Sequence, residues 1–164
     1  MNDELVQYVH QTIKFYNIID KDKAVEERMP INIYINTLGG DTDCCLGICS
    51  SILASITPVY TWNIGKAYSS GFIILLCGTK RFGFKHSQYL FHLGYAYKSG
   101  DYHKFMDFAD YYPTYIKDNI KKLVLDHSEL TEEGFNSLIK DDWWFSSEEA
   151  LSYGFIDEIA DNII

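Results

Sequence analysis

Apolar side chains recur with a helical period at the start of the chain, from Leu5 to Ile18, and the charged stretch Asp20 to Arg28 ends that pattern. From Ile31 to Asn36, isoleucines alternate with asparagine and tyrosine, a pattern typical of a half-buried strand. The dipeptide Gly39-Gly40 then ends the strand. We therefore expect a helix, a loop and a strand that stops at the diglycine.

The middle of the chain alternates helix-like and strand-like segments. Asp41-Thr42-Asp43 can cap a helix whose apolar residues run from Cys45 to Leu53. Val59 to Ile64 is rich in β-branched and aromatic residues, which predicts a second strand. Gly65 to Gly71 is expected to turn this strand into Phe72 to Leu76, the beginning of a buried helix.

Two short strand patterns follow, from Arg81 to Lys85 and from Gln88 to His92. The order strand, helix, strand, helix, strand is typical of an α/β fold with a largely parallel sheet. Asp101 to Leu125 has a long helical period, in which Pro113 predicts a kink or a break. Two further helix starts are indicated at Thr131-Glu132-Glu133-Gly134 and Ser146-Ser147-Glu148-Glu149.

Composition and charge narrow the class of protein. With 164 residues, 47% of them hydrophobic, the chain can form one core, and we expect a single domain over 1–164 with an N-terminal helix and loop over 1–30. The net charge of -9 has the wrong sign for binding nucleic acid or an anionic membrane. No apolar run could span a bilayer, and Met1-Asn2-Asp3-Glu4 does not resemble a signal peptide, so a cytoplasmic protein is expected.

The cysteines indicate core positions. Cys44, Cys45 and Cys49 fall within one expected helix, and Cys77 follows another apolar segment. They form no Cys-x-x-Cys pair, and no histidine is close to them in the sequence. We expect reduced core thiols, and neither a metal nor a cofactor.

Ser69 is the candidate nucleophile, in the run Gly65-Lys66-Ala67-Tyr68-Ser69-Ser70-Gly71. It stands between a strand and an apolar helix, with small residues two positions to either side, so its hydroxyl can project from a tight turn. The amide of Ser70 would lie at a helix N-terminus, where the helix dipole suits an oxyanion. For this heptamer alone, however, an ordinary serine N-cap is the commoner outcome.

Three other positions carry weaker signals. His92 ends a strand, Asp142 borders an aromatic cluster, and at Gly39-Gly40 the backbone can approach a ligand closely. Each also has a plainer interpretation. His92 can be a structural histidine, Asp142 a surface acid, and Gly39-Gly40 an ordinary turn. Asp141 is a competing candidate for the role of Asp142.

In this order, the segments resemble the Clp proteolytic subunit family, the peptidase component of an ATP-dependent protease. The resemblance covers residues 31–160 and rests on four blocks. They are Ile33-Tyr34-Ile35-Asn36-Thr37-Leu38-Gly39-Gly40; Gly65 to Gly71; Lys80-Arg81 with His86-Ser87-Gln88-Tyr89-Leu90-Phe91-His92; and Asp142 to Ala150 with Tyr153-Gly154-Phe155-Ile156-Asp157.

The resemblance implies a role for each candidate residue. Ser69 would be the nucleophile, His92 the general base and then acid, and Asp142 the group that fixes the histidine tautomer. The amides of Gly40 and Ser70 would form the oxyanion hole.

The resemblance also implies a fold and an assembly. The fold would be a spiral of strand and helix units, like that of ClpP and crotonase, with a protruding handle helix over 101–125. An unfolded protein or peptide would pair with the strand at Gly39 and Gly40. The subunits would form a seven-membered ring that can pair with a second ring, served by an ATP-driven AAA+ Clp unfoldase.

The chain departs from the family pattern at several places. Met1 lies almost at the start of the first helix, where the family has an axial loop and a strand. The usual Ser-Pro before the diglycine is Thr37-Leu38, and the usual Met after the nucleophile is Ser70. Gly94-Tyr95-Ala96-Tyr97 replaces a glycine-rich strand that pairs the two rings. These traits are similar to those of divergent members found in prophages.

Two alternatives stay open. A crotonase-type acyl-CoA hydratase or isomerase would share the spiral and the paired amides, but it normally carries catalytic glutamates near the second glycine turn, where this chain has Lys66, Tyr68 and Ser69. A catalytically silent assembly subunit would keep the fold without turnover.

Overall fold

The elements at the start of the chain lie where the apolar pattern predicts them. The computed structural model describes residues 1–94, 101–139 and 141–162. Helix α1 spans Asp3–Asp20, a short 3-10 helix (η1) spans Val25–Glu27, and strand β1 spans Ile31–Thr37. The expected alternation is borne out at Ile31 and Ile35, which are buried, while Ile33 between them is half-buried.

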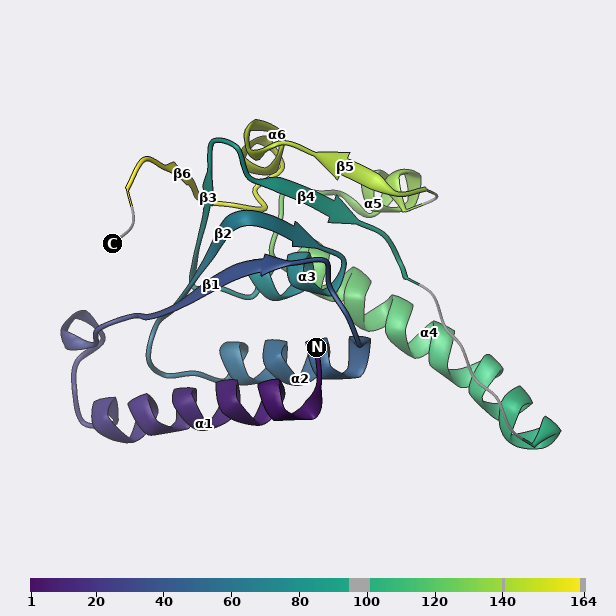
Figure 1. The fold of residues 1–164 in the computed structure, drawn as a ribbon, viewed down its shortest axis with the longest axis horizontal. Helices are drawn as coiled ribbons and strands as arrows, with labels where there is room; N and C mark the ends of the chain where they lie inside the picture. Colours follow the sequence, from purple (N-terminus) through teal and green to yellow (C-terminus); the bar gives the residue numbers. More distant parts are fainter. Residues whose placement is uncertain (95–100, 140, 163–164) are drawn as a thin grey trace.

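In the part of the chain that the structure describes, six strands form one curled sheet with β2 at its centre (Figure 1). The sheet order is β5, β4, β2, β3, β6, with β1 paired to β2 beside this path. Every pair is parallel except β4 with β5, so the expected largely parallel sheet is confirmed. After β1, the strands are β2 (Val59–Tyr68), β3 (Lys80–Phe84), β4 (Gln88–Phe91), β5 (Trp143–Phe145) and β6 (Glu158–Ala160).

Strand β2 is longer than the sequence pattern predicts. Its pairing with β1 steps from Ile35 opposite Asn63 to Thr37 opposite Ala67, so β2 carries two extra residues at this point. Beyond this bulge, β2 pairs with β4. The broad turn expected over residues 65–71 is therefore wrong: the strand continues to Tyr68, and the chain turns sharply at Ser69.

Helices cover the sheet in two layers (Figure 1). Helix α3 (Ser70–Leu76) packs against β2 with all of its residues buried, α2 (Thr42–Leu53) packs beside α3, and α1 packs on α2. Burying each large apolar side chain contributes about 2 kcal/mol. The two C-terminal helices are α5 (Glu132–Leu138) and α6 (Ser147–Ser152).

Helix α4 (Tyr102–Asp126) projects away from the body of the molecule, as expected of a handle (Figure 1). It runs through Pro113 without the break that the sequence allowed. Proline removes one backbone hydrogen bond, but Pro113 is exposed, and the buried residues Ile116, Ile120 and Val124 anchor the following turns.

The four cysteines, Cys44, Cys45, Cys49 and Cys77, are free and buried, as predicted. Within the described residues, no helix is long and apolar enough to cross a membrane.

Candidate active site

Ser69 has an unusual backbone conformation. Its φ of 54° and ψ of -123° make it the one non-glycine residue with a positive φ in the part of the chain that the structure describes. Such a conformation costs an L-residue about 1–3 kcal/mol. Ser69 directly precedes α3, yet its hydroxyl makes no capping hydrogen bond to the described helix, and its carbonyl instead accepts one from the Phe72 amide, at 2.9 Å. The interpretation of Ser69 as an ordinary side-chain cap is therefore wrong.

Strand β4 brings His92 to the same edge of the sheet. The Ser69 amide donates to the Leu90 carbonyl, at 2.8 Å, and so extends the parallel β2–β4 pairing by one step. Parallel strands end at the same edge, so the residues that follow both strands emerge there together. His92, directly after β4, has a side chain that is 18% exposed.

Strand β5 brings Asp142 opposite His92. Antiparallel pairing of Leu90 with Trp144 and of Phe91 with Trp143 makes Asp142 the next partner in the register. The His92 Nδ1 lies 3.4 Å from the Asp142 Oδ1. A carboxylate at this distance favours the histidine tautomer with its proton on Nδ1, in which Nε2 is the basic nitrogen. The register thus distinguishes Asp142 from its neighbour Asp141.

The diglycine lies directly against Ser69. Gly39 and Gly40 have φ values of 104° and 149°, which residues other than glycine rarely adopt. A Cβ at Gly39 would lie 2.8 Å from both the Ser69 Cβ and the Tyr68 carbonyl oxygen. Glycine is therefore required here for the loop to approach the serine so closely.

Two hydroxyls that the sequence analysis did not select anchor this loop. The Gly39 amide donates to Thr37 Oγ1 at 3.1 Å, and Ser70 Oγ donates to the Gly40 carbonyl at 2.9 Å. In the sequence, Thr37 at the end of a strand and Ser70 at the start of a helix could have indicated such anchors. The backbone groups that their hydroxyls reach are set by the folded structure.

Asp41 continues the loop into α2. Its carboxylate caps the helix by accepting from the Cys44 amide at 2.8 Å, as the sequence predicts for one of three candidates. This hydrogen bond is the main reason why the pKa of the Asp41 carboxyl lies below its ordinary value.

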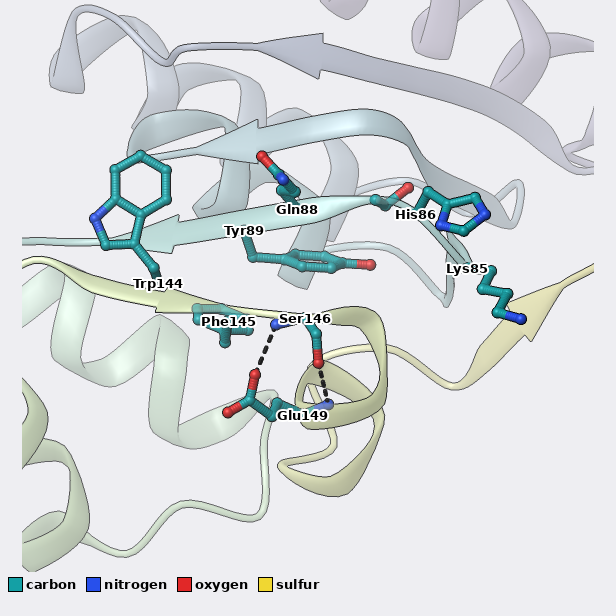
Figure 2. A pocket seen from close by; sticks show the side chains of 9 residues that line it. Lys85, His86, Gln88, Tyr89, Trp144, Phe145, Ser146 and Glu149 are labelled. Carbon is teal, nitrogen blue, oxygen red and sulfur yellow. Dashed lines mark hydrogen bonds between the residues drawn. The ribbon is translucent and has the colours of Figure 1, made fainter.

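A separate pocket of about 540 Å³ lies at the other end of β4 and β5 (Figure 2). Gln88 begins β4 there and Phe145 ends β5, while Ser146 and Glu149 form a reciprocal capping box at the start of α6. None of the predicted site residues lines this pocket. Within the described ranges, no group of three or more histidine, cysteine or acidic side chains is arranged to hold a metal ion.

Comparison with known proteins places the chain in a family. The sequence profile described as Clp protease matches residues 7–163. The chain belongs to the Clp protease family. The ATP-dependent Clp protease proteolytic subunits of Streptococcus suis and Streptococcus sanguinis are each 32% identical to it, over 85% of this chain and 72% of theirs.

A solved Clp structure supports the fold. A mutant of ClpP1 from Listeria monocytogenes superposes with a TM-score of 0.82 and 23% identity, covering 98% of this chain and 86% of the other. At that identity the likeness concerns the fold alone. Membership of the Clp protease family, by contrast, makes this chain a relative of peptidases and favours the peptidase over the crotonase alternative.

Proposed function

We propose that this Clp family member is a serine endopeptidase that acts through Ser69, His92 and Asp142. One observation carries the proposal. Ser69 has a strained φ of 54°, its hydroxyl does not cap the helix that follows, and it lies at the edge of the sheet where His92 meets Asp142. Strain of this kind gathers at functional sites.

In the proposed reaction, Ser69 Oγ attacks the carbonyl carbon of a peptide bond while His92 takes the hydroxyl proton. Asp142 holds the histidine tautomer and stabilises the imidazolium. The amides of Gly40 and Ser70 donate to the oxyanion, and His92 gives its proton to the leaving amine. Water, activated by His92, then hydrolyses the acyl-enzyme and regenerates Ser69.

An extended segment of an unfolded protein or peptide is the proposed substrate. Among the described residues, β1 pairs with β2 alone, so its other edge presents backbone groups that can bind a further strand. This edge leads into Gly39 and Gly40, beside Ser69. A substrate strand added there would carry its scissile bond to the proposed nucleophile.

Assembly into a seven-membered ring, able to pair with a second ring and to work with an AAA+ Clp unfoldase in the cytoplasm, is also proposed. The projecting helix α4 carries exposed aromatic residues, among them Tyr111 at 66% and Tyr115 at 39% exposure. Exposed aromatics of this kind favour a protein interface. The segment 94–97 stands where the family has its ring-pairing strand. Residues 95–97 of it lie outside the described residues.

A fluorophosphonate probe tests the chemistry. We expect it to label the wild-type protein and Ser50→Ala, which changes an exposed serine on α2, but not Ser69→Ala. Labelling that persists in Ser69→Ala would contradict the nucleophile. Failure of the probe to label any of the three proteins would favour the silent assembly subunit. The mass in solution, measured on the same samples, tests the ring, and a monomeric mass would contradict it.

A further inference from the structure

The peptide between Gly39 and Gly40 is the part of the proposed oxyanion hole whose own residues restrict it least, since neither carries a side chain. Its N–H is the proposed donor of Gly40, and both flanking residues are glycines with positive φ. Glycine permits many backbone conformations, so a diglycine peptide can rotate and turn its N–H away from a substrate. Something must hold this peptide in one orientation if the donor is to act reliably.

Two side-chain hydroxyls hold the backbone on either side of that peptide. Before it, the Gly39 amide donates to Thr37 Oγ1 at 3.1 Å. After it, the Gly40 carbonyl accepts from Ser70 Oγ at 2.9 Å. Fixing the group that precedes a peptide and the group that follows it restricts rotation of the peptide between them.

The Ser70 hydrogen bond also joins the two halves of the proposed hole. Ser70 is the first residue of α3 and is 4% exposed, so its hydroxyl is shielded from competing water. Its own amide is the second proposed donor, while its side chain holds the loop that carries the first. Ser70 therefore links the two proposed donors directly: it supplies one amide, and its side chain holds the residue that supplies the other.

Thr37 contributes through its methyl group as well. A Cβ added to Gly71 would collide with the Thr37 Cγ2, which shows that this methyl lies directly against the first turn of α3. The hydroxyl of the same side chain is thereby aimed at the diglycine loop. The loop is thus seated on α3 by packing at Thr37 and by a hydrogen bond from Ser70.

We propose that Ser70 and Thr37 are positioning residues that keep the Gly40 N–H directed at the oxyanion. The inference rests on the proposed serine peptidase function. It gives the side chain of Ser70, which stands where the family pattern has a methionine, a role in the reaction that differs from the role of its amide.

Replacing each hydroxyl in the full chain tests the inference. Ser70→Ala and the nearly isosteric Thr37→Val remove the hydroxyls, Thr37→Ser keeps one, and Ser147→Ala removes an equally buried hydroxyl that donates to the Phe84 carbonyl away from the site. The readouts are the rate constant of fluorophosphonate labelling, kcat and KM for a short fluorogenic peptide, and the thermal unfolding midpoint.

We expect Ser70→Ala and Thr37→Val to slow labelling and to lower kcat about tenfold with KM unchanged, because the donor is misdirected but not removed. Thr37→Ser should retain more of the labelling rate than Thr37→Val, because it keeps the hydroxyl but loses the methyl that aims it. Ser147→Ala should stay within about twofold of wild type. Wild-type labelling rates in both Ser70→Ala and Thr37→Val would overturn the inference. So would an equal loss in Ser147→Ala, which would indicate general destabilisation. A wild-type protein that the probe does not label would instead overturn the proposed function itself.

Discussion

The strained backbone of Ser69 predicts a difference in stability between two variants that does not depend on catalysis. Glycine adopts a φ of 54° with a ψ of -123° without the steric cost that a Cβ imposes. Ser69→Gly should therefore be more stable than Ser69→Ala by about 1 kcal/mol, although both lack the proposed nucleophile. Urea unfolding of the two variants measures this difference, and Ser50→Gly against Ser50→Ala, on the regular helix α2, should give the opposite sign. Equal stabilities of the two Ser69 variants would mean that the turn is not strained.

The strain at Ser69 also explains what the local sequence could and could not reveal. Small residues around the serine indicate a tight turn, but the bulge in β2 delays that turn until after Tyr68. The bulge depends on pairing with β1 and β4, which are distant in sequence. The conformation of a single residue is here decided by tertiary contacts that no local pattern records.

At the level of elements, α4 carries a removable defect. Pro113 lacks an amide hydrogen, so the helix loses one internal hydrogen bond at an exposed position. Pro113→Ala should restore that bond and stabilise the helix locally by up to about 3 kcal/mol. Slower amide hydrogen exchange across residues 102–116 would show the effect. The exposed substitution Thr114→Ala on the same helix should change exchange much less, and identical exchange in wild type and Pro113→Ala would contradict the prediction.

The helices and most of the strands were predictable from the sequence, and the two shortest strands were not. Helix α1 and the strands β1, β3 and β4 follow from apolar spacing and composition, as does β2 as far as Ile64, and α5 and α6 follow from their capping residues. Strands β5 and β6 have three residues each, too few for a period to emerge, and both are defined by their partners in the sheet. The order of Ser69, His92 and Asp142 was available through family resemblance. The meeting of His92 with Asp142 depends on the register between β4 and β5, and β5 is too short for its sequence to indicate that register.

Across the whole molecule, the C-terminal end of the fold is linked to β3 by two ion pairs, Lys80 with Glu158 and Arg81 with Asp157. Arg81 on β3 pairs with Asp157, which precedes β6, at 2.6 Å, and also donates to the His127 carbonyl just beyond α4. Burial alone would raise the pKa of the Asp157 carboxyl, but the hydrogen bonds and the charge of Arg81 outweigh it and hold that pKa below its ordinary value.

A lowered pKa in the folded state sets the direction of the pH dependence. The folded protein binds a proton at Asp157 less readily than the unfolded chain does, so the pair contributes stability above the unfolded pKa of about 4, and this contribution is lost as the pH falls through the lower folded value. Asp157→Asn should thus lower the free energy of unfolding at pH 7 by about 1 kcal/mol, because the carboxylate is partly exposed. The gap to wild type should close as the pH falls below 4. Urea unfolding between pH 7 and pH 3, at fixed protein concentration, measures it. Asp161→Asn, which removes an exposed charge just after β6, should leave the profile close to wild type. A gap for Asp157→Asn that is as large at pH 3 as at pH 7 would show that Asp157 stabilises the fold through something other than its charge.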